Sequence, residues 1–260
     1  MYVKCGALVE AQKAFDKLPL RSVVAWTALI AGYCQQGHSE EALDCFDQMR
    51  HEGLNPDAMT FTCVLKACGS TGAEDKGKEI HAEIMRGRFL EKGSDLGNAM
   101  VDMYAKCGAL EKAQEVFDML PKRDVFSWTA LIGGYCHLGY CDEALKLFEQ
   151  MKFEGLSPDA VTLSCVLKSC GIAGATEKGQ MLFETVRKNY GIVPALDHHS
   201  CMVDLSSKEG QFDKAMAIIK QMMPTSSMLL SWFPVLDACF KWGNMKLGSM
   251  AFEQKMKFGE

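Results

Sequence analysis

A segment of 35 residues occurs twice in this chain, 102 residues apart. Residues 23–57 read VVAWTALIAGYCQQGHSEEALDCFDQMRHEGLNPD, residues 125–159 read VFSWTALIGGYCHLGYCDEALKLFEQMKFEGLSPD, and 21 of the 35 positions are identical. The same offset relates MYVKCGAL at Met1 to MYAKCGAL at Met103, and CVLKAC at 63–68 to CVLKSC at 165–170. A fixed period of this kind is typical of solenoids, in which stacked repeats take the place of a single central core.

Each 35-residue repeat is predicted to form two helices. In the second copy, the first helix has its apolar face at Trp128, Leu131, Ile132 and Tyr135, with the spacing i, i+3, i+4, i+7. Gly139 is expected to end this helix because glycine tolerates the left-handed backbone conformation. The second helix has its apolar face at Ala144, Leu145, Phe148 and Met151. Gly155 ends this helix, and Pro158-Asp159 turns the chain into the next repeat.

The predicted fold is therefore all-α, a solenoid of antiparallel helix pairs wound into a right-handed superhelix, because no strand-like alternation persists and one hairpin cannot bury its apolar face alone. We divide the chain into a partial short repeat, a 35-residue repeat, a long repeat, a short repeat, a second 35-residue repeat, a second long repeat, a diverged short repeat and a last helical pair. Their predicted bounds are 1–22, 23–57, 58–93, 94–124, 125–159, 160–195, 196–228 and 229–260.

Composition excludes several classes of protein. No apolar stretch approaches the roughly 18 residues that indicate a membrane span, so no membrane partner is expected. The 12 cysteines lie mostly at equivalent positions of the repeats, which favours buried free thiols over a secreted disulfide scaffold. The net charge of -5 counts mildly against a nucleic-acid partner, and it suggests that any RNA binding depends more on base contacts than on attraction to phosphates.

Metal and catalytic motifs are weak. His81-Ala82-Glu83 matches half of a zinc deaminase signature, but the chain contains no C-x-x-C, which the other half requires. We interpret the C-x4-C spacings at 63/68, 136/141 and 165/170 as helix packing, and His198-His199 as a surface pair at a helix start. No phosphate-binding glycine loop is present, so we expect no metal, no cofactor and no enzymatic activity.

The repeats resemble those of the PLS subclass of plant pentatricopeptide repeat proteins. The motifs that carry the resemblance are WTALIxGYC with EEALxxFxxMxxxGLxPD, TFTCVLKACG with KGKEIHA, and NAMVDMYAKCGALEKAxxVFD. Together they cover essentially the whole chain. HHSCMVDL at 198–205 resembles the last short repeat of such proteins, and SWFPVLDACFKWGN at 231–244 resembles the extension motif that follows it.

This resemblance implies that each repeat selects one RNA base through a base-selecting pair, which consists of the repeat's fifth residue and its last residue. The pairs are Thr27 with Asp57, Asn98 with Asp124, and Thr129 with Asp159. A carboxylate only accepts hydrogen bonds, so it suits the ring N–H of guanine or uracil and disfavours adenine and cytosine. The resemblance implies that threonine as the fifth residue selects a purine and asparagine a pyrimidine. The three pairs would then select G, U and G. The alternative for these residues is helix capping, since Pro-Asp is also a helix start signal.

Some positions depart from the family pattern. The second residue of a repeat is usually apolar and packs between bases, but the short repeat has Asp95 there. The partial first repeat offers only Ser22, and the diverged repeat offers Ser200 with Met228. These three are weaker candidates, and no base is assigned to them.

The resemblance implies binding of single-stranded RNA in a plant organelle, the mitochondrion or alternatively the chloroplast, with selection of sites for C-to-U editing or another RNA modification. The deaminase domain of the family would follow the extension motif, and the chain stops at Glu260. Editing would then require a deaminase-bearing repeat protein or editing accessory factors in trans, or the remainder of a longer protein. A tetratricopeptide-like scaffold that binds a protein segment is the alternative function.

Overall fold

The structure is a computed structural model, and it describes residues 8–89, 95–189, 196–208 and 210–221 together with single positions at 236, 239, 240, 243, 248, 249 and 252. Within these residues the chain forms helices α1 to α13 and no strand. The chain divides into two compact units, Met1–Gly134 and Tyr135–Glu260, and the boundary lies inside α8 (Val125–His137). The all-α prediction is confirmed.

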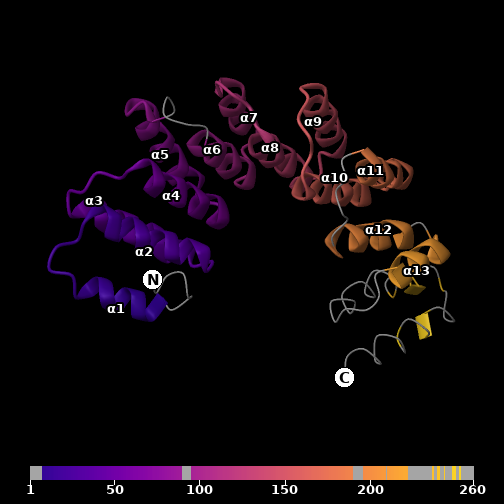
Figure 1. Ribbon diagram of the computed structural model, residues 1–260, viewed down its shortest axis with the longest axis horizontal. Coiled ribbons are helices and arrows are strands. Elements are labelled where there is room, and N and C mark those ends of the chain that lie inside the picture. Colours follow the sequence, from indigo (N-terminus) through magenta and orange to yellow (C-terminus); the bar gives the residue numbers. More distant parts are fainter. Residues whose placement is uncertain are drawn as a thin grey trace. The chain divides into compact units, whose positions relative to one another are not determined.

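The N-terminal unit is a stack of helical hairpins. Helices α2, α4 and α6 form one layer, because α4 packs against both of the others, and Figure 1 shows the three side by side. Helices α3, α5 and α7 each pack against the layer helix that precedes them in the chain. The bounds are α1 Leu8–Asp16, α2 Val23–Gln35, α3 Ser39–His51, α4 Ala58–Thr71, α5 Glu74–Arg86, α6 Asp95–Lys106 and α7 Leu110–Met119.

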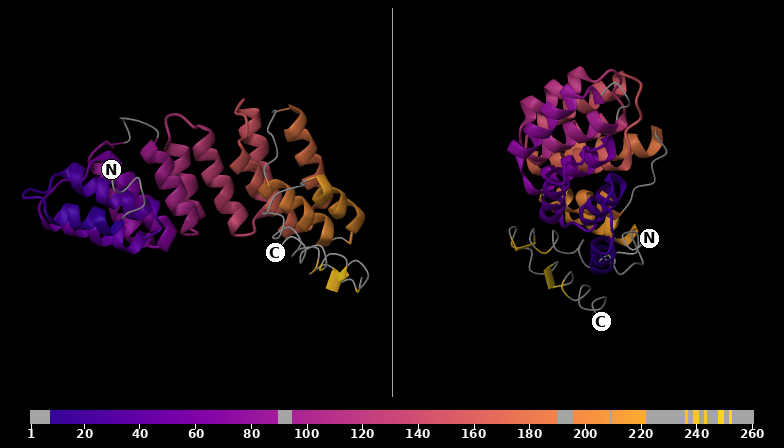
Figure 2. Two further views of the ribbon diagram at one scale, coloured as in Figure 1. Left: turned by 60° about the horizontal axis from the view of Figure 1, so that its bottom comes forward. Right: turned by 90° about the vertical axis from the view of Figure 1, so that its left-hand side faces the viewer.

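The C-terminal unit repeats this organisation. Helix α10 packs against α9, α11 and α12, and α12 packs in turn against α13. Figure 2 shows the helices of each unit from two further sides. The bounds are α9 Cys141–Phe153, α10 Ala160–Ala173, α11 Thr176–Asn189, α12 Leu196–Lys208 and α13 Phe212–Gln221.

Glycines end the helices at the same places in both copies of the 102-residue period. Each of these glycines has a positive φ, between 66° and 82°, which other residues adopt only at a cost. The backbone therefore turns in the same way at matched positions. The four pairs are Gly37 with Gly139, Gly53 with Gly155, Gly72 with Gly174, and Gly108 with Gly210.

An aromatic pair lies at the start of each 35-residue repeat. Phe15 meets Trp26 edge to face with ring centroids 4.5 Å apart, and Phe117 meets Trp128 in the same way at 4.7 Å. An arginine covers the phenylalanine ring in each case, with Arg21 lying 5.1 Å from the Phe15 centroid. Both tryptophans are buried, so this contact ties each 35-residue repeat to the short repeat before it.

The C-terminal part of the chain differs from prediction at one residue and is only partly described. His198 was predicted at the surface, but it is 1% exposed, and its Nε2 donates to the backbone oxygen of Ala160 at 2.7 Å. The surface interpretation was wrong because α12 packs His198 against the start of α10. Most of the predicted last helical pair lies outside the described residues, although Leu236 and Cys239 pack with the cluster around Val203.

The packing of α9 predicts that replacing two of its phenylalanines by alanine lowers the free energy of unfolding by very different amounts. Phe148 is fully buried, whereas Phe153 is 92% exposed. We expect Phe148→Ala to lower the free energy of unfolding by about 3–5 kcal/mol, because it leaves a cavity between packed helices. The control Phe153→Ala should change it by less than about 0.5 kcal/mol. Urea unfolding followed by circular dichroism measures both, and equal costs for the two variants would contradict the packing described here.

Candidate nucleic-acid interface

The predicted pair Thr27 and Asp57 is joined by a third residue, Thr60. Asp57 is the N-cap of α4, and its Oδ1 accepts from the backbone N of Thr60 at 2.8 Å and from Thr60 Oγ1 at 2.8 Å. Thr60 Oγ1 also lies 2.7 Å from Thr27 Oγ1, which in turn is 2.8 Å from the backbone oxygen of Val23. Thr60 is fully buried and Thr27 is 8% exposed, whereas Asp57 is exposed. The structure thus brings the two predicted residues together through the Thr60 hydroxyl.

The pair Asn98 and Asp124 is in direct contact. Asn98 Nδ2 lies 3.1 Å from Asp124 Oδ1 and 3.0 Å from Oδ2, so the amide donates to the carboxylate. Asp124 Oδ1 also accepts from the backbone N of Ser127 at 2.9 Å, at the start of α8. Ser127 Oγ donates to the backbone oxygen of Asp124 at 2.9 Å. The remaining amide oxygen of Asn98 is buried and has no hydrogen-bond partner among the described residues.

The third pair is divided between the two units. Asp159 caps α10 as Asp57 caps α4, since its Oδ1 accepts from both the backbone N and the Oγ1 of Thr162 at 2.8 Å. Thr129 lies in α8, within the N-terminal unit. Its pairing with Asp159 therefore stays a prediction.

All three aspartates cap helices, so capping and base selection would use the same side chains. The residues that the sequence analysis missed are the buried hydroxyls three positions later, Thr60, Ser127 and Thr162. A signal for them is present in the sequence, because D-x-x-[ST] is a variant of the capping box. The pattern occurs as DAMT, DVFS and DAVT.

Apolar side chains at the second position of the repeats are exposed. Their exposed fractions are 74% for Val24, 62% for Met59, 71% for Phe126 and 58% for Val161. Each sits one residue into the first helix of its repeat, two residues after the capping side chain and three before the fifth residue. Asp95, at the start of α6, is exposed as well. Aromatic and aliphatic groups placed in this way offer flat apolar surface to a base.

The weaker candidates have separate positions. Ser22 is the N-cap of α2, and its side chain accepts from the backbone N of Ala25 at 3.3 Å. Ser200 lies in α12 and is partly buried. Met228 lies outside the described residues.

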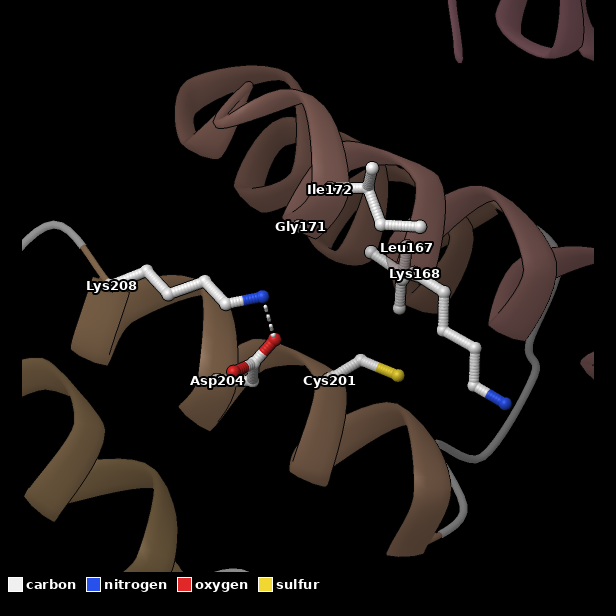
Figure 3. A pocket seen from close by; sticks show the side chains of 7 residues that line it. All are labelled: Leu167, Lys168, Gly171, Ile172, Cys201, Asp204 and Lys208. Atoms are coloured by element: carbon white, nitrogen blue, oxygen red, sulfur yellow. Dashed lines mark ion pairs between the residues drawn. The ribbon is translucent and has the colours of Figure 1, made fainter. Parts of the chain in front are cut away.

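A shallow pocket lies between α10 and α12. It measures about 180 Å³, and Figure 3 shows Lys168 and Ile172 on one side of it with Cys201, Asp204 and Lys208 on the other. Lys208 Nζ lies 2.8 Å from Asp204 Oδ2, and the equivalent ion pair in α6, Lys106 with Asp102, measures 2.7 Å. Small-molecule sites usually measure roughly 300–1,000 Å³, so this pocket does not suggest a cofactor.

The residues of the motif His81-Ala82-Glu83, considered above as half of a zinc site, bond to other side chains of the protein. His81 Nδ1 lies 2.9 Å from the Tyr104 hydroxyl, and burial lowers the pKa of His81. Glu83 pairs with Arg50 at 3.4 Å. No group of three potential ligands capable of holding a metal ion occurs among the described residues.

The comparisons with known proteins agree on one family. The PPR repeat family matches residues 21–70 and 123–171, and a single PPR repeat matches residues 98–125 and 198–223. This chain belongs to the pentatricopeptide repeat family. Such a protein of Arabidopsis thaliana is 40% identical over 100% of this chain and 35% of its own length. The chloroplastic pentatricopeptide repeat protein CRR2 of the same plant is 38% identical over 96% of this chain and 38% of its own length.

A mitochondrial pentatricopeptide repeat protein of Arabidopsis is 35% identical over 99% of this chain and 41% of its own length. The chain thus spans half or less of the length of these relatives. Among solved structures, the pentatricopeptide repeat protein PPR10 from maize superposes with a TM-score of 0.63 at 19% identity, covering 100% of this chain and 43% of PPR10. This likeness supports the helical solenoid fold.

No described helix of this pentatricopeptide repeat chain combines the length and the apolar character needed to cross a membrane. Among the described residues eleven cysteines are free, and Cys5 lies outside them. Burial raises the pKa of Cys34, Cys68 and Cys136 to about 12. Their thiols therefore stay protonated at neutral pH.

This burial predicts slow alkylation of the native protein. The thiolate is the reactive form, and at pH 8 a thiol with a pKa of about 12 holds roughly a thousandfold less thiolate than an ordinary cysteine. We expect Cys34, Cys68 and Cys136 to react with iodoacetamide at least about a hundredfold more slowly in the native protein than in urea. Raising the pH from 7 to 9 should speed the reaction in urea and leave these three native thiols almost fully protonated. Peptide mass spectrometry measures each site, and equal rates in both states would show that these thiols are accessible.

Proposed function

We propose that this chain binds single-stranded RNA in a sequence-specific manner, with one base per base-selecting pair. The observation that carries the proposal is the structure of the two pairs of the N-terminal unit. Thr27 is joined to Asp57 through Thr60, and Asn98 donates directly to Asp124. Two side chains from different helices thus meet at one place per repeat, which is what recognition of a single base edge requires.

The exposed apolar residues support the proposal. Val24, Met59 and Phe126 each lie at the start of a first helix, two residues after its capping side chain, which is a base-selecting aspartate for Met59 and Phe126. Stacking on such groups stabilises single-stranded nucleic acid without regard to sequence, whereas the paired polar groups discriminate between bases. A net charge of -5 means that these contacts, and not bulk attraction to phosphates, would supply most of the affinity.

The relatives support the same class of ligand and an organellar setting. PPR10 has been crystallised with an 18-nt psaJ RNA element, and that structure superposes with a TM-score of 0.59 at 13% identity over 97% of this chain and 43% of PPR10. Relatives include mitochondrial and chloroplastic proteins. We propose that the protein acts in the mitochondrion or the chloroplast.

The finer assignment rests on the sequence motifs. We propose that the chain is of the PLS subclass with an extension motif at 229–260, and that it marks sites for C-to-U editing or another RNA modification. The chain itself would not be catalytic. A deaminase would be supplied by a partner repeat protein, together with accessory factors, or by further sequence.

Selection from a random pool of single-stranded RNA tests the proposal. The base-selecting pairs predict enrichment of G, then a position without preference, then U and then G, in the order of the repeats 23–57, 58–93, 94–124 and 125–159. An excess of duplex with the enriched sequence should not compete, because its base edges are already paired. A folded, helical protein that enriches no sequence would contradict RNA recognition and favour the protein-binding scaffold.

A single exchange tests the base assignment. Asp159→Asn introduces an amide donor where the carboxylate only accepts, so the preference of that repeat should shift from G toward A. Asparagine is also a good N-cap, so α10 should remain folded. Fluorescence anisotropy with RNAs that differ only at this base measures the shift. The control Asp213→Asn, which removes the same charge from the exposed surface of α13, should leave the preference at G. An unchanged preference in Asp159→Asn would show that Asp159 does not select the base.

A further inference from the structure

The hydrogen bonds around Thr60 have a fixed direction. Asp57 as a carboxylate only accepts, so Thr60 must donate its one hydroxyl proton to Asp57 Oδ1 at 2.8 Å. Thr60 Oγ1 also accepts from the backbone N of Asp57 at 3.4 Å. Its second lone pair faces Thr27 Oγ1 at 2.7 Å, and the proton in that contact must come from Thr27. The Thr60 hydroxyl is then fully used, with one bond donated and two accepted.

This direction fixes what Thr27 can offer to a ligand. Its only hydroxyl proton is committed to Thr60, with the Val23 backbone oxygen at 2.8 Å as a further acceptor for the same proton. Thr27 can therefore present only an oxygen lone pair. Asp57 Oδ2 accepts no hydrogen bond from any described residue and also presents only lone pairs. The pair thus offers two acceptors side by side.

Two adjacent acceptors complement guanine better than the other bases. The edge of guanine carries the N1–H and N2–H₂ donors next to each other, whereas uracil has a single N–H between two carbonyl oxygens. Adenine and cytosine have a ring nitrogen that accepts, and it would face a lone pair. An acceptor pair therefore selects G against A and against both pyrimidines.

The neighbouring repeat lacks this coupling. Ser127 occupies the position equivalent to Thr60, but its Oγ donates to the backbone oxygen of Asp124 and makes no hydrogen bond with Asn98. Asn98 donates to Asp124 directly and its Nδ2 has a second proton. A donor beside an acceptor matches the carbonyl and N–H of uracil. The two pairs thus differ in the direction of their hydrogen bonds as well as in their fifth residue.

We propose that Thr60, which lies outside the base-selecting pair, is a positioning residue for base selection by the repeat 23–57. Its hydroxyl accepts the proton of Thr27, together with the Val23 backbone oxygen, and holds Asp57, which makes the pair acceptor-only and specific for guanine. This inference rests on the proposed RNA-binding function. Thr162 holds Asp159 with the same two bonds in the C-terminal unit.

The experiment compares Thr60→Val with the wild-type chain. The probes are four labelled single-stranded RNAs of the sequence enriched from the random pool, which differ only in the base assigned to Thr27 and Asp57. The variant has no hydroxyl, so the Thr27 proton keeps only the Val23 backbone oxygen as an acceptor, and the Thr27 hydroxyl can turn from it to donate to adenine. The backbone N of residue 60 can still cap α4 through Asp57 Oδ1. We expect the preference for G over A to fall by about 3- to 10-fold, the effect of one hydrogen bond.

Three variants keep the test specific. Thr60→Ser restores the hydroxyl and should restore the preference for G. Thr71→Val removes another hydroxyl of α4, which bonds only to the backbone oxygens of Ala67 and Cys68, and should leave the preference for G unchanged. Thr60→Ala is used if the valine variant does not fold, as judged by circular dichroism, and the same fall is expected.

The outcomes separate the two proposals. A wild-type protein that binds RNA with a preference for G, together with an unchanged preference in Thr60→Val, overturns the role of Thr60 and leaves RNA recognition intact. A wild-type protein without any base preference overturns both. A loss of affinity for all four RNAs without a change in their ratio would show that Thr60 is only structural.

Discussion

The structure of each unit depends on the burial of apolar side chains between consecutive helical hairpins. A single hairpin would leave Phe46 or Phe148 in water, and both are fully buried. Phe46 meets Phe61 of the next first helix, α4, and α9, which carries Phe148, packs against α10. In the N-terminal unit the first helix α4 packs against both α2 and α6. The arginine-covered aromatic pairs, Phe15 with Trp26 and Phe117 with Trp128, are part of the same burial. This burial fixes the positions of the polar side chains at the starts of these helices.

The aspartates at the ends of the repeats show how a structural role and a recognition role share one side chain. The carboxylate of Asp57 satisfies the backbone N of Thr60 with one oxygen, and its other oxygen has no donor among the residues that the structure describes. The cap holds the carboxylate still, and a rigid group discriminates between bases at a lower entropic cost than a mobile one. Capping and base selection are therefore compatible, and the helix-start interpretation of Pro-Asp does not exclude the other role.

Much of this could be predicted from sequence because the 102-residue period repeats both the apolar faces and the glycines. The helices and their glycine ends follow from local patterns, and the structure shows positive φ at Gly37 and Gly139. The contacts of Thr60 could not be predicted, because they depend on the distance between α2 and α4 and not on spacing along the chain. His198 was placed wrongly for a similar reason, since its partner, the Ala160 backbone, is 38 residues away in sequence. The pairing of Thr129 with Asp159 remains a prediction.

The capping role of Asp57, Asp124 and Asp159 limits which residues these three positions can hold. An N-cap favours Ser, Thr, Asp and Asn, and replacing one by alanine costs about 1 kcal/mol. Only these few side chains can vary there without loosening the first helix of the following repeat. The requirement for an N-cap thus limits, before any RNA is bound, the set of side chains that can distinguish bases at these positions. Replacing one of these aspartates by a large apolar side chain should therefore affect two neighbouring repeats at once. The repeat that it ends would lose its base selectivity, and the first helix of the next repeat would fray at its N-terminus.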